Sequence, residues 1–194
     1  MRRAKSMKKI LFVDATVRDN SRTRELAEYL ISKLEGDVTH LVLRDEDIVP
    51  LDKKRLEERT KFCEEHNFSD SYFNYAKQFL DADIIVIAAP YWDGSFPAVL
   101  KKYVETISVC GLTFEYTEDG ACVGLCKAKK LYYVTTAGGM IFDDAFGYGY
   151  IKGLALNQFG IKETQMFKVE NLDIIGVDTK VLLAQAKEAI KSKL

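Results

Sequence analysis

Five short runs of β-forming residues alternate with helical patterns along the chain, and this alternation constrains the fold more than any other feature. Two of the runs, ILFV at 10–13 and IIVIAA at 84–89, are apolar without polar alternation, as central strands covered on both faces are. The five runs span residues 8–14, 39–44, 83–89, 129–136 and 163–171. Their alternation with helices predicts an α/β fold, a five-stranded parallel sheet with helices on both faces.

The segments between these runs repeat apolar side chains at helical spacing. In the first of them, Leu26, Leu30 and Leu34 fall on one face. The predicted helices span residues 21–35, 69–81, 97–109, about 145–158 and 178–194. Residues 45–70, between the second strand and the next helix, are highly charged, and we interpret them as a solvated surface excursion.

The length and composition indicate one domain. A chain of 194 residues that is 47% hydrophobic can bury one core, and its three prolines mark no linker. We expect a single domain at 8–194, including the 45–70 insertion. A flexible N-terminal extension at 1–7 precedes it, and Met7 is a candidate for the natural start.

The charge balance and the cysteines limit the partners. Lys and Arg number 28 against 29 Asp and Glu, so no basic field favours nucleic acid, and a small-molecule partner fits better. No run approaches the roughly 20 apolar residues that span a bilayer, so we expect no membrane contact and a cytoplasmic location. The four cysteines lack CxxC pairs and zinc-type spacing with the two histidines, so we expect reduced thiols, surface histidines and no metal. The cysteines are Cys63, Cys110, Cys122 and Cys126.

In parallel α/β sheets a ligand binds beyond the carboxyl ends of the strands, so the loops after the first, third and fourth runs form the candidate site. The first loop opens a helix with several arginines and hydroxyl side chains. They are Arg18, Arg22, Arg24, Thr16, Ser21 and Thr23. Cations are unfavourable at a helix start, where N–H groups carry partial positive charge, so their crowding predicts a bound anion such as phosphate. The alternative is an ordinary Ser or Asn cap followed by a solvated face.

The loop after the third run, Pro90 to Phe96, concentrates aromatic side chains. Pro97 suits the first turn of the helix that follows, and Gly111 is placed to end that helix. Aromatic side chains beside a phosphate site predict a flat ring system as the ligand. Alternatively, Trp92 and Phe96 simply pack the helix onto the sheet.

The loop after the fourth run contains the pair Gly138 and Gly139. Because neither has a side chain, their backbone N–H groups can approach a ligand closely, as in oxyanion sites. The alternative interpretation is a tight turn.

Together the three loops resemble those of the flavodoxin-like NAD(P)H:quinone oxidoreductases and FMN-dependent azoreductases. The similarity runs through nearly the whole chain from residue 8. It is strongest over AAPYWDGSFPAVLKKYVETISVCGLTFEYTEDG at 88–120 and GLCKAKKLYYVTTAGG at 124–139. Members of this family carry a similar proline–aromatic loop, the same helix after it, a hairpin of the TF.YT..G type and a final Gly-Gly.

The resemblance implies a flavodoxin-like sheet with strand order 2-1-3-4-5. It also implies bound FMN, NADH or NADPH as electron donor, and ping-pong transfer to quinones or related azo and nitro acceptors. In this family the region corresponding to 45–70 often reaches the partner subunit of a homodimer, so a homodimer is expected here.

The same resemblance assigns roles to residues of the three loops. Thr16, Ser21, Arg22 and Thr23 would hold the FMN phosphate. Pro90, Tyr91, Trp92, Asp93 and Phe96 would line the ribityl chain and the ring. Thr136, Ala137, Gly138 and Gly139 would meet the polar edge of the isoalloxazine, with the backbone of the two glycines as the expected catalytic element.

The chain departs from the family pattern in two places. Asp93 stands where azoreductases commonly have asparagine, which removes a hydrogen-bond donor beside the ring. The hairpin carries Cys122 and Cys126, where the family pattern has no cysteine. The alternative functions are a flavodoxin-type electron carrier, although such carriers are typically strongly acidic, and a non-catalytic flavin-binding protein. An iron–sulfur flavoprotein would need a cysteine cluster in 45–70, where only Cys63 occurs.

Overall fold

A computed structural model of the chain describes residues 7–194. Apart from Met7, the extension predicted at 1–7 lies outside the described residues.

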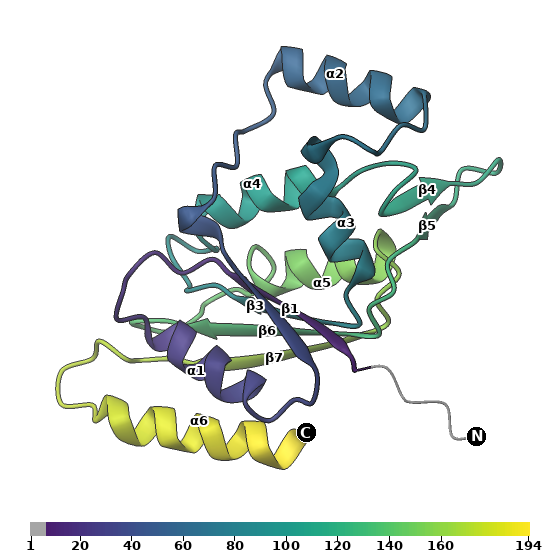
Figure 1. Ribbon diagram of the computed structural model, residues 1–194. Coiled ribbons are helices and arrows are strands. Elements are labelled where there is room, and N and C mark those ends of the chain that lie inside the picture. Colours follow the sequence, from purple (N-terminus) through teal and green to yellow (C-terminus); the bar gives the residue numbers. More distant parts are fainter. Residues whose placement is uncertain (1–6) are drawn as a thin grey trace, which may run out of the picture.

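The central sheet has five parallel strands in the order β2-β1-β3-β6-β7 (Figure 1). These strands are β1 (Lys9–Asp14), β2 (Asp37–Val42), β3 (Ile84–Ala88), β6 (Lys130–Thr136) and β7 (Glu163–Val169). Counted within this sheet alone, they follow the expected order 2-1-3-4-5. The labels differ because a separate antiparallel hairpin, β4 (Phe114–Tyr116) and β5 (Cys122–Gly124), intervenes in the chain.

Helices cover both faces of the sheet (Figure 1). The helices α1 (Arg22–Ile31) and α6 (Thr179–Lys193) lie on one face. On the other face lie α3 (Asn74–Asp81), α4 (Ala98–Ile107) and α5 (Tyr148–Asn157). Successive strand side chains point to opposite faces, so alternate residues of β1 enter different cores. Leu11 and Val13 pack on the α4 side, whereas Ile10 and Phe12 pack on the α1 side.

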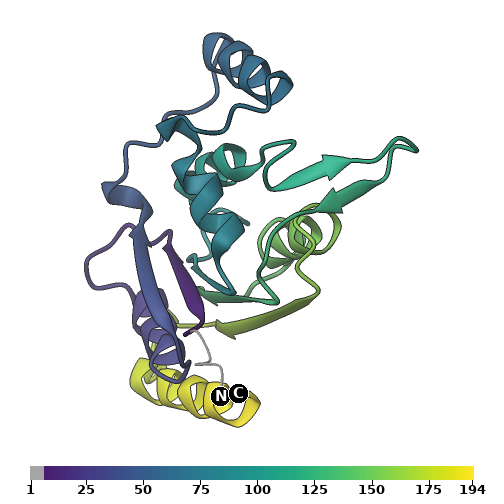
Figure 2. The ribbon, with the colours of Figure 1, turned by 45° about the vertical axis from the view of Figure 1, so that its right-hand side comes forward.

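Within the charged excursion a further helix, α2 (Lys53–Glu64), forms without a buried residue. It extends outward beyond α3 and α4, away from the sheet (Figures 1 and 2). Arg59 on α2 fastens it to the end of α4, donating from Nη1 to the carbonyl oxygens of Glu105 at 2.9 Å and Ser108 at 3.4 Å. Two short 3-10 turns, η1 (Leu43–Asp45) and η2 (Ser71–Phe73), flank this region. The excursion is therefore solvated only in part: Ile48 is buried in the main core, and Phe62, Cys63 and Phe68 pack against the cluster around Phe73.

The end of α4 differs from the sequence-based expectation. The helix stops at Ile107, and Ser108 caps it by donating its N–H to the carbonyl oxygen of Val104. Gly111, expected to end the helix, instead has φ +81° in the turn that leads into the hairpin, where its N–H donates to Phe114 O at 2.7 Å. A left-handed φ is easy only for glycine, which explains this residue at the turn.

None of the helices within 7–194 is both long and apolar enough to cross a bilayer.

Candidate functional site

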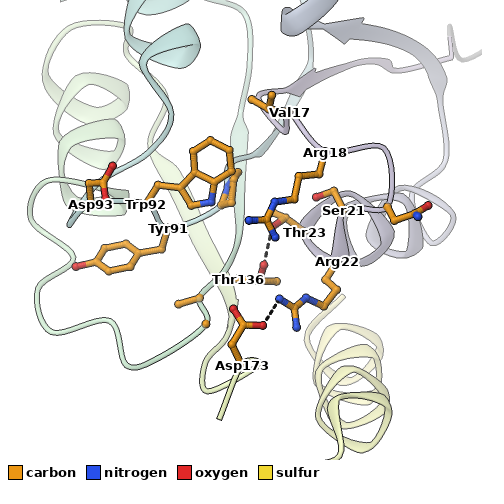
Figure 3. Close-up of a pocket in the computed structure, with 14 residues that line it drawn as sticks. Val17, Arg18, Ser21, Arg22, Thr23, Tyr91, Trp92, Asp93, Thr136 and Asp173 are labelled. Carbon is orange, nitrogen blue, oxygen red and sulfur yellow. Dashed lines mark hydrogen bonds and ion pairs between the residues drawn. The ribbon is translucent and has the colours of Figure 1, made fainter. Parts of the chain in front are cut away.

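A pocket of about 530 Å³ lies at the carboxyl ends of β1, β3, β6 and β7 (Figure 3). Ten of the site residues expected from the sequence line it: Ser21, Arg22, Thr23, Pro90, Tyr91, Trp92, Asp93, Thr136, Ala137 and Gly138. Four other residues line it as well: Val17, Arg18, Asn20 and Asp173. Thr16, Phe96 and Gly139 were expected at the site but are not among its lining residues.

The start of α1 supplies hydroxyl and N–H groups at one end of the pocket. Ser21 is the N-cap of this helix, and its side chain accepts a hydrogen bond from the Arg24 N–H at 3.2 Å. The cap interpretation is therefore correct for Ser21, while the N–H groups of the first turn have no partner inside a helix. Thr16 Oγ1, just before this turn, is fully buried and has no hydrogen-bond partner among residues 7–194. An unpaired buried hydroxyl beside a helix N-terminus fits a bound anion.

The arginines of this turn do not all face an anion. Arg22 donates from Nη1 to Leu172 O at 2.8 Å and from Nη2 to Asp173 Oδ1 at 2.7 Å. Arg24 binds the fully buried carboxylate of Asp14 through Nε at 2.5 Å. These protein partners relieve most of the charge crowding that the sequence suggested.

Arg18 differs from its neighbours. It lines the pocket and forms no ion pair within the described part of the chain. In Figure 3 its side chain extends across the pocket between Trp92 and Thr23. The backbone that carries Arg18 is itself held, because Arg44 donates to Val17 O at 2.8 Å and pairs with Asp19 at 2.7 Å. Of the arginines on this side, Arg18 is the one whose charge remains for a ligand.

The aromatic loop is shaped by a two-residue hairpin. Trp92 and Ser95 exchange backbone hydrogen bonds of 2.9 and 2.8 Å, with Asp93 and Gly94 at the tip at φ 50° and 81°. An Asp-Gly pair is a favoured tip for such a turn because both positions need positive φ. The turn presents Trp92 to the pocket (Figure 3). The Tyr91 N–H donates to Thr136 O at 2.9 Å and joins this loop to the end of β6.

Phe96 does not reach the pocket lining. It packs against the core beneath α4, with its ring 5.6 Å from that of Tyr150. Tyr150 belongs to α5, so this ring contact joins the aromatic loop to α5. That Phe96 holds α4 to the sheet stays a prediction.

Of the Gly138–Gly139 pair, Gly138 lines the pocket and Gly139 follows it. Their carbonyl oxygens accept from Asp173 N–H at 2.9 Å and Asn171 N–H at 3.0 Å, which fixes the loop after β7. Within residues 7–194, neither glycine N–H donates to another residue. A Cβ added at Gly138 would overlap Asp173 Oδ2, whereas Gly139 faces open space. The pair is thus a turn that also leaves two N–H donors for a ligand.

Glu170, directly after β7, binds the loop that follows the Gly138–Gly139 pair. Its Oε1 accepts from the Ile141 N–H at 2.7 Å, and its Oε2 pairs with Lys168 at 2.7 Å. Burial by itself raises the pKa of Glu170, but the hydrogen bonds from Lys168 and Ile141 outweigh it and hold the pKa below the ordinary 4.5. An ionised Glu170 carboxylate therefore holds the loop after β6 through the Ile141 N–H.

The cysteines lie apart from the pocket and form no disulfide in the described part of the chain. Burial raises the pKa of the Cys126 thiol to about 12, so this thiol stays protonated. Its Sγ lies 3.6 Å from Thr113 O. Cys110 and Cys122 are exposed. These placements agree with reduced thiols that take no part in the site.

Sequence reasoning missed Asp173 and Glu170. Both follow the fifth strand at the same edge of the sheet as the other site residues. A signal exists in the sequence: every strand of a parallel sheet ends at this edge, so the loop after the fifth strand is also a candidate for the site.

Residues 8–194 match the family model Flavodoxin_2, which is described as a flavodoxin-like fold. An "FMN-dependent NADH:quinone oxidoreductase" of Clostridium perfringens (strain SM101 / Type A) is 34% identical over 197 residues, covering 97% of each chain. A protein with the same name from Coprothermobacter proteolyticus is 35% identical over 196 residues, covering 94% of this chain and 96% of that protein.

Solved structures show the same fold. The azoreductase from Bacillus anthracis str. Sterne superposes with a TM-score of 0.82 at 22% identity, covering 96% of this chain and 98% of that chain. An FMN-dependent NADH-azoreductase from Bacillus anthracis str. Ames Ancestor, in complex with FMN, gives a TM-score of 0.78 at 21% identity, covering 97% of each chain.

Proposed function

The chain belongs to the Flavodoxin_2 family, and from this membership we propose that it is an FMN-dependent NADH:quinone oxidoreductase. Relatives with that name match it over almost their full length, so the proposal concerns the whole chain. The observation that carries it is the pocket. Hydroxyl and N–H groups, an indole and two N–H donors on glycines line or border one cavity at the strand ends. Quinones are the proposed acceptors, with azo and nitro compounds as related ones.

The residues present fit FMN. At the phosphate end, the buried Thr16 hydroxyl, Ser21, Thr23 and the first-turn N–H groups of α1 supply donors, and Arg18 supplies a positive charge. Arg22 contributes through its backbone N–H, because its guanidinium is bound to the loop after β7.

At the ring end, the aromatic loop and the glycine pair fit a flat, polar-edged ligand. Trp92, Tyr91 and Gly138 line the pocket, and Gly139 follows directly after Gly138 in the chain. A pocket of about 530 Å³ is in the usual size range for a cofactor site. Phe96 acts only indirectly, by packing against the core and against Tyr150 of α5.

The chemistry that FMN supplies when bound is acceptance of a hydride from NADH and transfer of two electrons to the acceptor. The protein's own part is to bind and orient the flavin and to shield it from water. The Gly138 and Gly139 N–H groups offer fixed dipoles where negative charge grows at the polar edge. The indole of Trp92 keeps water from one side of the pocket. One shared binding place for NADH and acceptor gives a ping-pong scheme.

The protein reconstituted with FMN tests this function. We expect NADH alone to bleach the flavin absorbance under anaerobic conditions, and added quinone to restore it. Double-reciprocal plots at several quinone concentrations should be parallel. A protein that binds FMN but is not reduced by NADH would be an electron carrier instead, and a protein that takes up no FMN would contradict the whole proposal.

We also propose a homodimer in the cytoplasm. Apolar side chains are exposed beside the pocket, including Phe142 at 79% and Ile175 at 101%, and a second copy would cover them. Leu56 on α2 is exposed as well, which suits contact of that helix with the partner subunit. Thiols without disulfides fit a reducing compartment. Sedimentation of the FMN-loaded protein should give a mass near twice 22.0 kDa, and a monomer would contradict the dimer.

A further inference from the structure

Asp173 places a carboxylate inside the pocket from the loop after β7. Its N–H donates to Gly138 O at 2.9 Å, so the residue is fixed against the glycine pair through its backbone. Its side chain lies where a Cβ of Gly138 would be, and the close approach is open only because residue 138 is glycine.

The two oxygens of this carboxylate have different surroundings. Oδ1 accepts from Arg22 Nη2 at 2.7 Å. Figure 3 shows the second oxygen on the side of the carboxylate away from Arg22. This Oδ2 lies against Gly138, 2.3 Å from where a Cβ would be. Within residues 7–194, no hydrogen-bond donor is paired with Oδ2. Arg22 therefore orients the carboxylate by one oxygen and leaves the other as an acceptor that faces a ligand.

We propose that Asp173 is a ligand-binding residue, whose Oδ2 accepts a hydrogen bond from the imide N3–H of the bound isoalloxazine. This inference rests on the proposed FMN function. The polar edge of that ring presents an acceptor, a donor and an acceptor in order: a carbonyl, the N3–H and a second carbonyl. An ionised carboxylate can only accept, so it matches the single donor of this edge and is repelled by the two carbonyls.

The neighbouring groups complete the pattern. The N–H groups of Gly138 and Gly139 are donors, and they suit the carbonyl oxygens on either side of the N3–H. Arg22 acts through Asp173 and is a positioning residue. Its role here differs from the one implied by family resemblance, in which it would hold the phosphate.

A flavin that lacks the donor tests this assignment directly. Apo-protein is titrated with FMN and with 3-methyl-FMN, in which a methyl group replaces the N3 hydrogen, and binding is followed by quenching of flavin fluorescence. Loss of a hydrogen bond to a charged acceptor should weaken binding of the methylated compound about ten- to hundredfold in the wild-type protein. Hydrogen bonds from ribityl hydroxyls would not respond to this change.

Variants locate the effect. Asp173→Ala should bind FMN more weakly and should lose the discrimination between the two flavins. The matched control Glu188→Ala removes an exposed carboxylate from α6, outside the pocket, and should discriminate as the wild type does.

Two results would overturn the inference. One is equal affinity of the wild-type protein for both flavins, a comparison that needs no variant to fold. The other is a methyl penalty that persists in Asp173→Ala, which would indicate a steric clash elsewhere. Both leave FMN binding intact, whereas failure to bind either flavin would count against the proposed function itself.

Discussion

The side-chain hydroxyls of Thr23 and Thr136 lie 2.6 Å apart and join the first turn of α1 to the end of β6. Both residues are buried. This bond connects two walls of the pocket, so the spacing between them is set before any ligand arrives.

Removing one of these hydroxyls should destabilise the protein without any flavin present. Thr23→Val leaves the Thr136 hydroxyl buried and unpaired, so we expect the free energy of unfolding to fall by about 1–3 kcal/mol. The double variant Thr23→Val/Thr136→Val leaves neither group unpaired and should recover much of the loss. Urea unfolding of the apo-proteins measures both. Additive losses in the double variant would show that the two hydroxyls do not depend on each other.

Arg18 and Arg22 should affect FMN in different ways. Arg18→Ala removes a positive charge of the pocket that has no ion-pair partner within residues 7–194. It should weaken FMN binding by about 1–3 kcal/mol, while leaving riboflavin affinity unchanged because riboflavin has no phosphate. Arg22→Ala frees Asp173 and should weaken both flavins alike. Fluorescence titration of each variant with each flavin checks this. A phosphate-specific loss in Arg22→Ala would restore its guanidinium as the phosphate ligand.

Glu170 should make stability depend on pH in acid. Its folded-state pKa is held below the ordinary value, so its contribution is fully present above about pH 5 and is lost as the pH falls through the folded pKa. Glu170→Gln should cost about 0.5–1 kcal/mol at neutral pH, since it removes the charge that Lys168 faces. Urea unfolding of both proteins should show this difference shrinking as the pH falls below the ordinary carboxyl pKa of 4.5. A difference that is constant with pH would mean that the charge is not what matters.

The thiols should react with iodoacetamide at very different rates. Cys110 and Cys122 are exposed and should be labelled first. Cys126 should be labelled slowest, because burial raises the pKa of its thiol and the reactive thiolate is scarce. Peptide mass spectrometry over a time course gives the order. Cys122→Ser is the control that separates the two hairpin cysteines. Early labelling of Cys126 would contradict the buried placement.

The central strands were predictable because such strands need unbroken apolar runs, and the run at 84–89 is of this kind. The helix α2 was not predictable in the same way. It buries no residue fully, and only Phe62 and Cys63 pack against the Phe73 cluster, so little apolar periodicity marks it. Arg59 adds bonds to carbonyl groups 46 and 49 positions away.

The site was predicted residue by residue with uneven success for similar reasons. An aromatic residue in a loop can face a ligand or the core, and the sequence does not distinguish Trp92 from Phe96. The resemblance implies that Arg22 binds the phosphate, and no local pattern indicates its bond to Asp173, which lies 151 positions along the chain. Local patterns found the loops, whereas pairings between distant loops decided what each side chain does.

Because Gly138 has no side chain, the residues at positions 138 and 173 are expected to evolve together. Any larger residue at 138 would displace the Asp173 carboxylate, so a substitution at 138 should have the same effect on binding as the loss of this carboxylate. We therefore expect Gly138→Ala and Asp173→Ala to be strongly epistatic, with the double variant little worse than either alone. Across the family, an acid at the second position should be found only together with glycine at the first.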